Sequence, residues 1–179
     1  QPIVSVLSYN IDFEQGENAF AAKAELNVAN ESGTAIDNMI FTLNPGLQID
    51  AITYDDQSVN FTRDLHLFKI DAPIDAGEKG TLQISYSGSI DNRAFYLSTP
   101  KEVRDKLHEI MVYKRGKEHG FVEPNYVLLT PEANWYPLAG ASQGTDPKPG
   151  GRLTVAAGPA GTRLLRRRGL DPHRALRPR

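Results

Sequence analysis

Short apolar segments in which polar residues take every second position fill the first half of the chain. In the clearest of them, Phe20 and every second residue after it to Val28 are apolar, with Lys23, Glu25 and Asn27 between them. A period of two is typical of a strand with one buried face. Similar segments follow every ~8–12 residues with turn signals between them, a spacing typical of an all-β sandwich. The expected strands are 4–13, 20–28, 36–43, 47–53, 65–70, 82–86 and 121–129.

One segment has the pattern of a helix instead. Thr99-Pro100-Lys101-Glu102 supplies an N-cap threonine, a proline at the first helical position and a glutamate at the third. The apolar residues Val103, Leu107, Ile110 and Met111 then share one helical face, and Lys114-Arg115-Gly116 provides a basic last turn and a stop. We therefore expect a mostly β protein, an antiparallel β-sandwich with one inserted helix near residues 100–115.

Composition divides the chain into two unequal parts. Residues 1–145 hold 11 Lys and Arg against 20 Asp and Glu, whereas residues 146–179 hold 9 against 2. We expect a β-domain over residues 1–157. Residues 158–179 form an Arg-rich tail without interleaved aromatic residues or amphipathic order, so we expect it to be disordered or non-native and expect no nucleic-acid partner. Because the chain has no cysteine, disulfides and thiolate metal sites are excluded.

Three features of residues 5–140 carry a resemblance to a known family. They are the turn Leu43-Asn44-Pro45-Gly46, a strand that ends Tyr86-Ser87-Gly88, and the segment 125–140, NYVLLTPEANWYPLAG, with its aromatic–proline pair. Together they resemble the saddle-shaped N-terminal β-domain of M1-family zinc aminopeptidases. The last segment is most similar to M1-like domains fused to bacterial ABC-type transporter permeases.

The resemblance implies a saddle-like scaffold that forms one wall of a peptide-binding cleft. Zinc-dependent aminopeptidase chemistry would come from a downstream catalytic domain of the same parent protein, which is the expected partner. The family's Gly-Ala-Met-Glu-Asn strand and His-Glu-x-x-His zinc helix do not occur in this sequence. We therefore expect no catalytic residue, metal ligand or cofactor in this chain, and zinc is implied for the parent alone. His108-Glu109 lacks the second histidine one helical turn on, because position 112 is valine.

Glu132 is the candidate substrate-binding residue. In M1 enzymes the N-terminal domain contributes an acidic or amide side chain, shortly before the aromatic–proline pair, that helps hold the substrate's α-ammonium group. Glu132 lies five residues before Pro137. The alternative is a loop carboxylate that caps a turn beside Pro131.

The candidate packing residues are Trp135, Tyr136 and Pro137. We expect them to pack the loop against its own domain or against the parent's catalytic domain, because aromatic pairs contribute much of the area buried between domains. Without the catalytic domain, this face would be exposed and the chain would self-associate through Trp135 and Tyr136. A stacking platform for sugars or peptides is the alternative.

Two other classes of function stay open on the sequence. One is a stand-alone binding module that recognises a sugar or a protein through its loops. The other is an extracytoplasmic structural or binding module of a bacterial transporter permease. The residues alone assign neither a cellular location nor an enzymatic activity.

Overall fold

The structure is a computed structural model of the chain, and it describes residues 2–92, 120–130, 133–141 and 152–157. These residues form twelve strands and no α-helix. They also contain no helix that is long and apolar enough to cross a membrane. The helix that we expected near residues 100–115 and the tail 158–179 lie outside the described residues.

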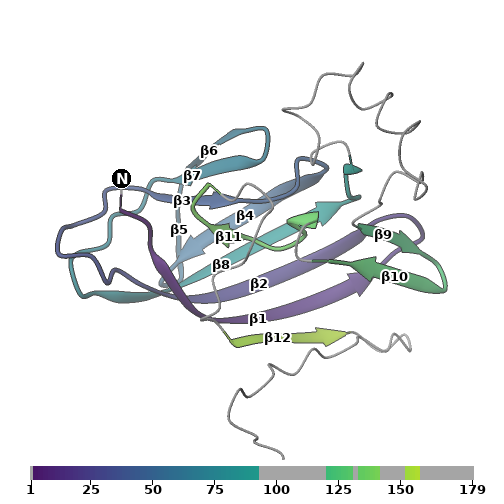
Figure 1. Ribbon diagram of the computed structural model, residues 1–179, viewed down its shortest axis with the longest axis horizontal. Coiled ribbons are helices and arrows are strands. Elements are labelled where there is room, and N and C mark those ends of the chain that lie inside the picture. Colours follow the sequence, from purple (N-terminus) through teal and green to yellow (C-terminus); the bar gives the residue numbers. More distant parts are fainter. Residues whose placement is uncertain (1, 93–119, 131–132, 142–151, 158–179) are drawn as a thin grey trace, which may run out of the picture.

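The larger sheet has six strands in the order β12-β1-β2-β8-β4-β5 (Figure 1). Three long strands form its centre, β1 (Ser5–Gln15), β2 (Phe20–Ala29) and β8 (Lys79–Gly88), and they pair antiparallel. On one side it ends in β4 (Leu47–Tyr54) and the short β5 (Gln57–Ser58). On the other side β12 (Arg152–Ala157) runs parallel to β1. We had expected an antiparallel sheet, and this one pair departs from that expectation.

The smaller sheet has four strands in the order β11-β3-β7-β6. Its members are β11 (Leu138–Ala139), β3 (Met39–Thr42), β7 (Leu67–Ile70) and β6 (Phe61–Asp64). A separate hairpin joins β9 (Gly120–Glu123) to β10 (Tyr126–Leu129). The hairpin lies beside the ends of β1 and β2 in Figure 1.

A single apolar core fills the space between the two sheets. The larger sheet contributes residues such as Ile11, Leu26 and Ile84, and the smaller sheet contributes Phe41 and Phe68. The last two rings stack with their centroids 5.7 Å apart. On β2 the buried and exposed positions alternate as the sequence pattern predicts, because each second residue of a pleated strand points to the same face. The mostly β fold with packed sheets is therefore confirmed.

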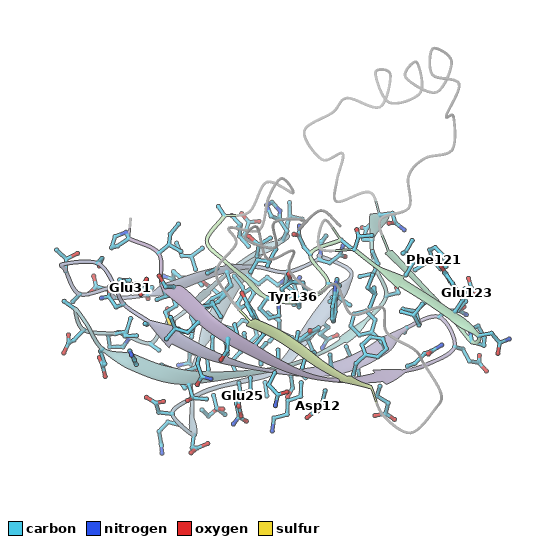
Figure 2. The ribbon with its side chains drawn as sticks, turned by 60° about the horizontal axis from the view of Figure 1, so that its bottom comes forward. Asp12, Glu25, Glu31, Phe121, Glu123 and Tyr136 are labelled. Carbon is cyan, nitrogen blue, oxygen red and sulfur yellow. The ribbon has the colours of Figure 1, made fainter. Side chains whose placement is uncertain are left out.

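The opposite face of the larger sheet is polar. Asp12 on β1 is paired with Lys23 on β2, and Asn10 is paired with Glu25. Figure 2 shows Asp12 and Glu25 pointing away from the body of the molecule. This face is therefore the solvated side of the sheet.

Three strand predictions were wrong in extent. The segment 65–70 contributes β7 only from Leu67 onward, because Leu65 and His66 form the β6–β7 turn. The segment 121–129 was expected to be one strand, but it is the β9–β10 hairpin, in which Glu123 pairs with Tyr126 across Pro124 and Asn125. Proline has no N–H to donate, so a continuous strand through Pro124 is disfavoured. The segment 36–43 contributes β3 from Met39 onward, while Ile36 makes an isolated bridge to Ile74.

A close approach of two backbones explains the glycine at the end of β8. Gly88 has φ +137°, a conformation that side-chain-bearing residues rarely adopt, and a Cβ there would collide with the carbonyl oxygen of Gly46. A Cβ on Gly46 would in turn collide with the backbone of Ser89 and Asp91. The Tyr-x-Gly ending thus lets the β3–β4 turn pack directly on the end of β8.

Candidate functional site

The loop that follows the β9–β10 hairpin lies against the core of this chain. Trp135 and Tyr136 are only 5% and 6% exposed, and Pro137 is buried as well. Immediately afterwards β11 pairs with β3, and the hydroxyl of Thr42 donates a hydrogen bond to the Gly140 carbonyl (2.7 Å). The end of the loop is therefore held by the smaller sheet.

The Trp135 ring packs among aromatic side chains of the larger sheet. Its centroid lies 6.3 Å from that of Phe13 and 6.5 Å from that of Phe20, in both cases edge to face. Tyr136 is 5.0 Å from Trp135, and on its other side it meets the ring of Tyr9 at 5.4 Å. Edge-to-face pairs are a favourable aromatic geometry. The two rings therefore pack against their own domain, and Figure 2 shows Tyr136 within the body of the molecule. The interdomain role of these residues stays a prediction.

The buried side chain of Asn44 fixes the start of the same loop. Its Nδ2 donates to the carbonyl oxygens of Ala133 (2.9 Å) and Asp91 (3.3 Å), and its Oδ1 accepts from the backbone N–H groups of Gly46 and Asp91 (both 2.9 Å). The backbone N–H of Asn44 also donates to the carbonyl of Asn134 (2.8 Å). One amide therefore joins three segments: the β3–β4 turn, the residues after β8 and the loop.

Arg63 holds the β3–β4 turn from the other side. Its guanidinium is half-buried and donates to the carbonyl oxygens of Asn44 (2.8 Å), Leu43 (3.4 Å) and Leu47, while its Nε donates to Leu65 (2.8 Å). Burial lowers the pKa of Arg63 from its ordinary value. An arginine side chain keeps its proton in proteins, so all these donors remain available. Arg63 thus binds three carbonyl groups along the β3–β4 turn and the start of β4.

Glu132, the candidate ligand of an α-ammonium group, lies outside the described residues together with Pro131. The structure describes the residues on either side of Pro131 and Glu132, and there the Ala133 N–H donates a hydrogen bond to the Thr130 carbonyl (2.9 Å). Asn134 has a positive φ of 47°, which asparagine tolerates better than most residues. The binding role of Glu132 stays a prediction. The backbone that follows it, at Ala133 and Asn134, is held by hydrogen bonds with Asn44.

Three tyrosines, Tyr9, Tyr86 and Tyr136, form the polar part of this region. Burial raises the pKa of the Tyr9 and Tyr86 phenols well above the ordinary value, and Tyr136 adds to both shifts. Both phenols are therefore neutral at physiological pH and cannot serve there as bases. The Tyr86 hydroxyl is buried and has no hydrogen-bond partner among the described residues.

We expect Tyr86→Phe to leave the free energy of unfolding unchanged or to raise it by up to about 1 kcal/mol, because it removes a buried hydroxyl for which the described part of the chain provides no hydrogen-bond partner. Urea unfolding measures the change. Tyr86→Leu is the contrast: it also removes the ring that packs edge-on to Phe20 at 6.2 Å, and it should cost about 2 kcal/mol or more. A loss above about 1 kcal/mol for Tyr86→Phe would mean that the hydroxyl is satisfied, for example by a buried water.

No group of three or more His, Asp or Glu side chains that could hold a metal ion occurs among the described residues. His108-Glu109 lies outside them. The Nδ1 atom of His66 is buried without a hydrogen-bond partner in the described part of the chain, at the tip of the β6–β7 hairpin. A lone histidine is no metal site, so these residues provide no geometry for metal chemistry.

An aromatic pair on the hairpin, one ring half-buried and the other exposed, was not anticipated. Phe121 and Tyr126 stack across the β9–β10 hairpin with their centroids 5.5 Å apart, and Tyr126 is 60% exposed. The side chain of Gln15 ties the hairpin turn to β1 by donating to the carbonyls of Glu123 (2.6 Å) and Pro124 (3.2 Å). Figure 2 places Phe121 and Glu123 on the hairpin, away from Tyr136. The signal in the sequence was Pro124-Asn125, a turn between two short apolar runs.

The comparisons with known proteins give a likeness of fold. No family model matches the chain, and no curated protein matches it. A mutant of a two-domain M1 zinc metallopeptidase bound to L-tryptophan aligns with 88% of this chain and 33% of its own, at 17% identity and a TM-score of 0.56. The M1 zinc metallopeptidase of Deinococcus radiodurans aligns with 51% of this chain and 22% of its own, at 20% identity and a TM-score of 0.45. On the first of these matches, the chain resembles in fold the N-terminal β-domain of M1 zinc metallopeptidases and spans about a third of that protein's length (33%).

Proposed function

We propose that this chain is the non-catalytic N-terminal β-domain of an M1 aminopeptidase-like protein. The observation that carries the proposal is the alignment of 88% of the chain with a two-domain M1 zinc metallopeptidase. In this proposal the domain is a scaffold and one wall of a peptide-binding cleft. A further domain of the same protein would hold the zinc ion, which would supply Lewis-acid chemistry for peptide hydrolysis.

The construction of the loop supports its role as a wall. Trp135 and Tyr136 attach its C-terminal half to the core, and Asn44 fixes the backbone at Ala133 and Asn134. A rigid support of this kind is what a substrate-binding side chain requires, because a ligand held on a loose loop loses binding energy to the ordering of that loop. Glu132 immediately precedes the fixed backbone, which favours it as the group that binds the substrate's α-ammonium.

The pair of exposed Tyr126 and half-buried Phe121 is the part of the described surface that best suits contact with the further domain. Aromatic side chains are enriched where surfaces are buried against a partner. Trp135 and Tyr136 are only 5% and 6% exposed, so they offer little surface for the self-association that we expected through them. The contact with the further domain that we propose here uses the hairpin instead. Nothing in the comparisons supports the association with a transporter permease.

The gene that encodes this chain provides the first test. Under the proposal it continues into a catalytic domain with a His-Glu-x-x-His helix and a more distant glutamate ligand. Sequencing of the complete reading frame that shows no such motif would overturn the assignment and would favour a stand-alone binding module.

Glu132→Gln in the complete parent protein tests the role of the loop. We expect the KM for aminoacyl-p-nitroanilide substrates to rise about 10-fold or more, because a charge-assisted hydrogen bond contributes about 1.5–3 kcal/mol. Glu17→Gln is the matched control, since Glu17 is an exposed carboxylate in the β1–β2 turn. If both variants keep the parental KM, Glu132 is not the ammonium ligand, although the assignment of the domain would stand.

A further inference from the structure

The last described strand, β12, is held by one neighbour. Among the described strands it pairs with β1 alone, parallel and in register from Ser8 opposite Arg152 to Phe13 opposite Ala157. Parallel pairs have slanted hydrogen bonds and are slightly less stable per residue than antiparallel pairs. They also require a crossover connection. A single ladder therefore attaches β12 to the described part of the sheet. It joins residues that are more than a hundred positions apart in the sequence.

The route into β12 crosses between the two sheets. The chain leaves β11 in the smaller sheet beside Ile3, because a Cβ on Gly140 would lie 2.9 Å from the Ile3 Cδ1 atom. It enters the larger sheet at Arg152, opposite Ser8, five residues farther along. Ten residues, 142–151, make this connection, and they include three glycines and two prolines. A connection of this length spans roughly 30 Å when extended, which is enough to reach a neighbouring molecule.

The β1 edge needs a strand beside it. Without β12, the N–H and C=O groups that residues 8–13 of β1 direct toward it would be unpaired. This stretch includes Ile11, whose side chain is fully buried. A bare edge of this kind is a template for another strand. The described contacts of β12 are those of its ladder with β1, and the same residues from another molecule would make an identical ladder.

We propose that the edge of β1 over residues 8–13 is a strand-acceptor site that binds β12 of a second copy of this chain. Two copies that exchange β12 reciprocally keep every hydrogen bond of the closed monomer. Such exchange costs little in interaction energy, because each contact is replaced by its equivalent. Leu153 and Val155 take register positions opposite Tyr9 and Ile11 in either arrangement. This proposal concerns a different surface from the aromatic hairpin and does not depend on the proposed function.

The absence of cysteine from the chain permits a specific cross-linking test. Asn10 and Thr154 are directly opposite each other in the parallel register, at a spacing that suits a disulfide. One full-length variant carries Asn10→Cys and another carries Thr154→Cys; equal amounts are mixed, incubated and mildly oxidised. We expect a disulfide between the two chains, identified by mass spectrometry of the joined peptides, with a yield that rises with protein concentration.

The control pairs Thr154→Cys with Gln83→Cys. Gln83 is on β8, opposite Glu25, which is itself opposite Asn10, so it lies on the same sheet face two strands away. Exchange predicts several-fold more product for the Asn10 pair than for this collision control, and equal yields would overturn the proposal. A chain with residues 142–151 deleted is the positive control. Without this connection β12 cannot reach β1 of its own chain, so this variant should sediment as a dimer. If Asn10→Cys and Thr154→Cys form product only when both chains also carry the deletion, the natural chain keeps its own strand and the proposal is overturned.

Discussion

Asn44→Ala is expected to lower the free energy of unfolding by about 4 kcal/mol, because it removes several hydrogen bonds to buried or partly buried backbone groups, at about 1–3 kcal/mol each. The groups are the N–H of Gly46 and Asp91 and the carbonyl of Ala133, at distances of 2.9 Å from the Asn44 amide. Urea unfolding can be followed by the fluorescence of Trp135, the single tryptophan, which lies two residues from Ala133. The emission of the folded variant should also shift to longer wavelength as the loop loosens.

Asn27→Ala is the matched control for this change. Asn27 lies on the polar face of β2 and donates a hydrogen bond to the Ser8 hydroxyl (2.8 Å), but the pair is exposed to water. Its loss should cost well under about 1 kcal/mol, because water replaces an exposed partner. If Asn44→Ala costs no more than Asn27→Ala, water must satisfy the same groups, and Asn44 is not what holds the loop.

Gly88→Ala is expected to cost about 3 kcal/mol, since it combines an unfavourable φ with a collision against the backbone of Gly46. Two other glycines separate these effects. Gly77 has φ +79° and open space around it, so Gly77→Ala tests backbone strain alone, about 1–2 kcal/mol. Gly33 has open space without a strained φ, and Gly33→Ala should be near neutral.

Thermal and urea unfolding of the three variants should rank their losses in the order Gly88, Gly77, Gly33. A loss at Gly88 no larger than at Gly77 would show that the end of β8 moves away from the β3–β4 turn at little cost. In that case the close approach of the two backbones would not explain the Tyr-x-Gly ending.

The candidate site could be predicted only in part. The sequence singled out the segment with Trp135, Tyr136 and Pro137, and their packing against this domain was among the expectations. Asn44 and Arg63 were missed as its supports, because a Leu-Asn-Pro-Gly turn predicts a turn whether its asparagine is exposed or buried. Several of the carbonyls that those side chains reach are distant in the sequence: Leu43 is 20 positions from Arg63, and Ala133 is 89 positions from Asn44.

The sequence by itself determined the strands and their buried faces, as on β2, because the alternation of side chains is a local property of an extended backbone. It also determined the β3–β4 turn, since proline and glycine limit the backbone directly. Only the tertiary structure decided that β12 runs parallel to β1, that 121–129 folds back as a hairpin, and that Trp135 lies between Phe13 and Phe20. These outcomes depend on which distant surfaces meet, and the free energy of burying them is shared among residues that no local pattern connects.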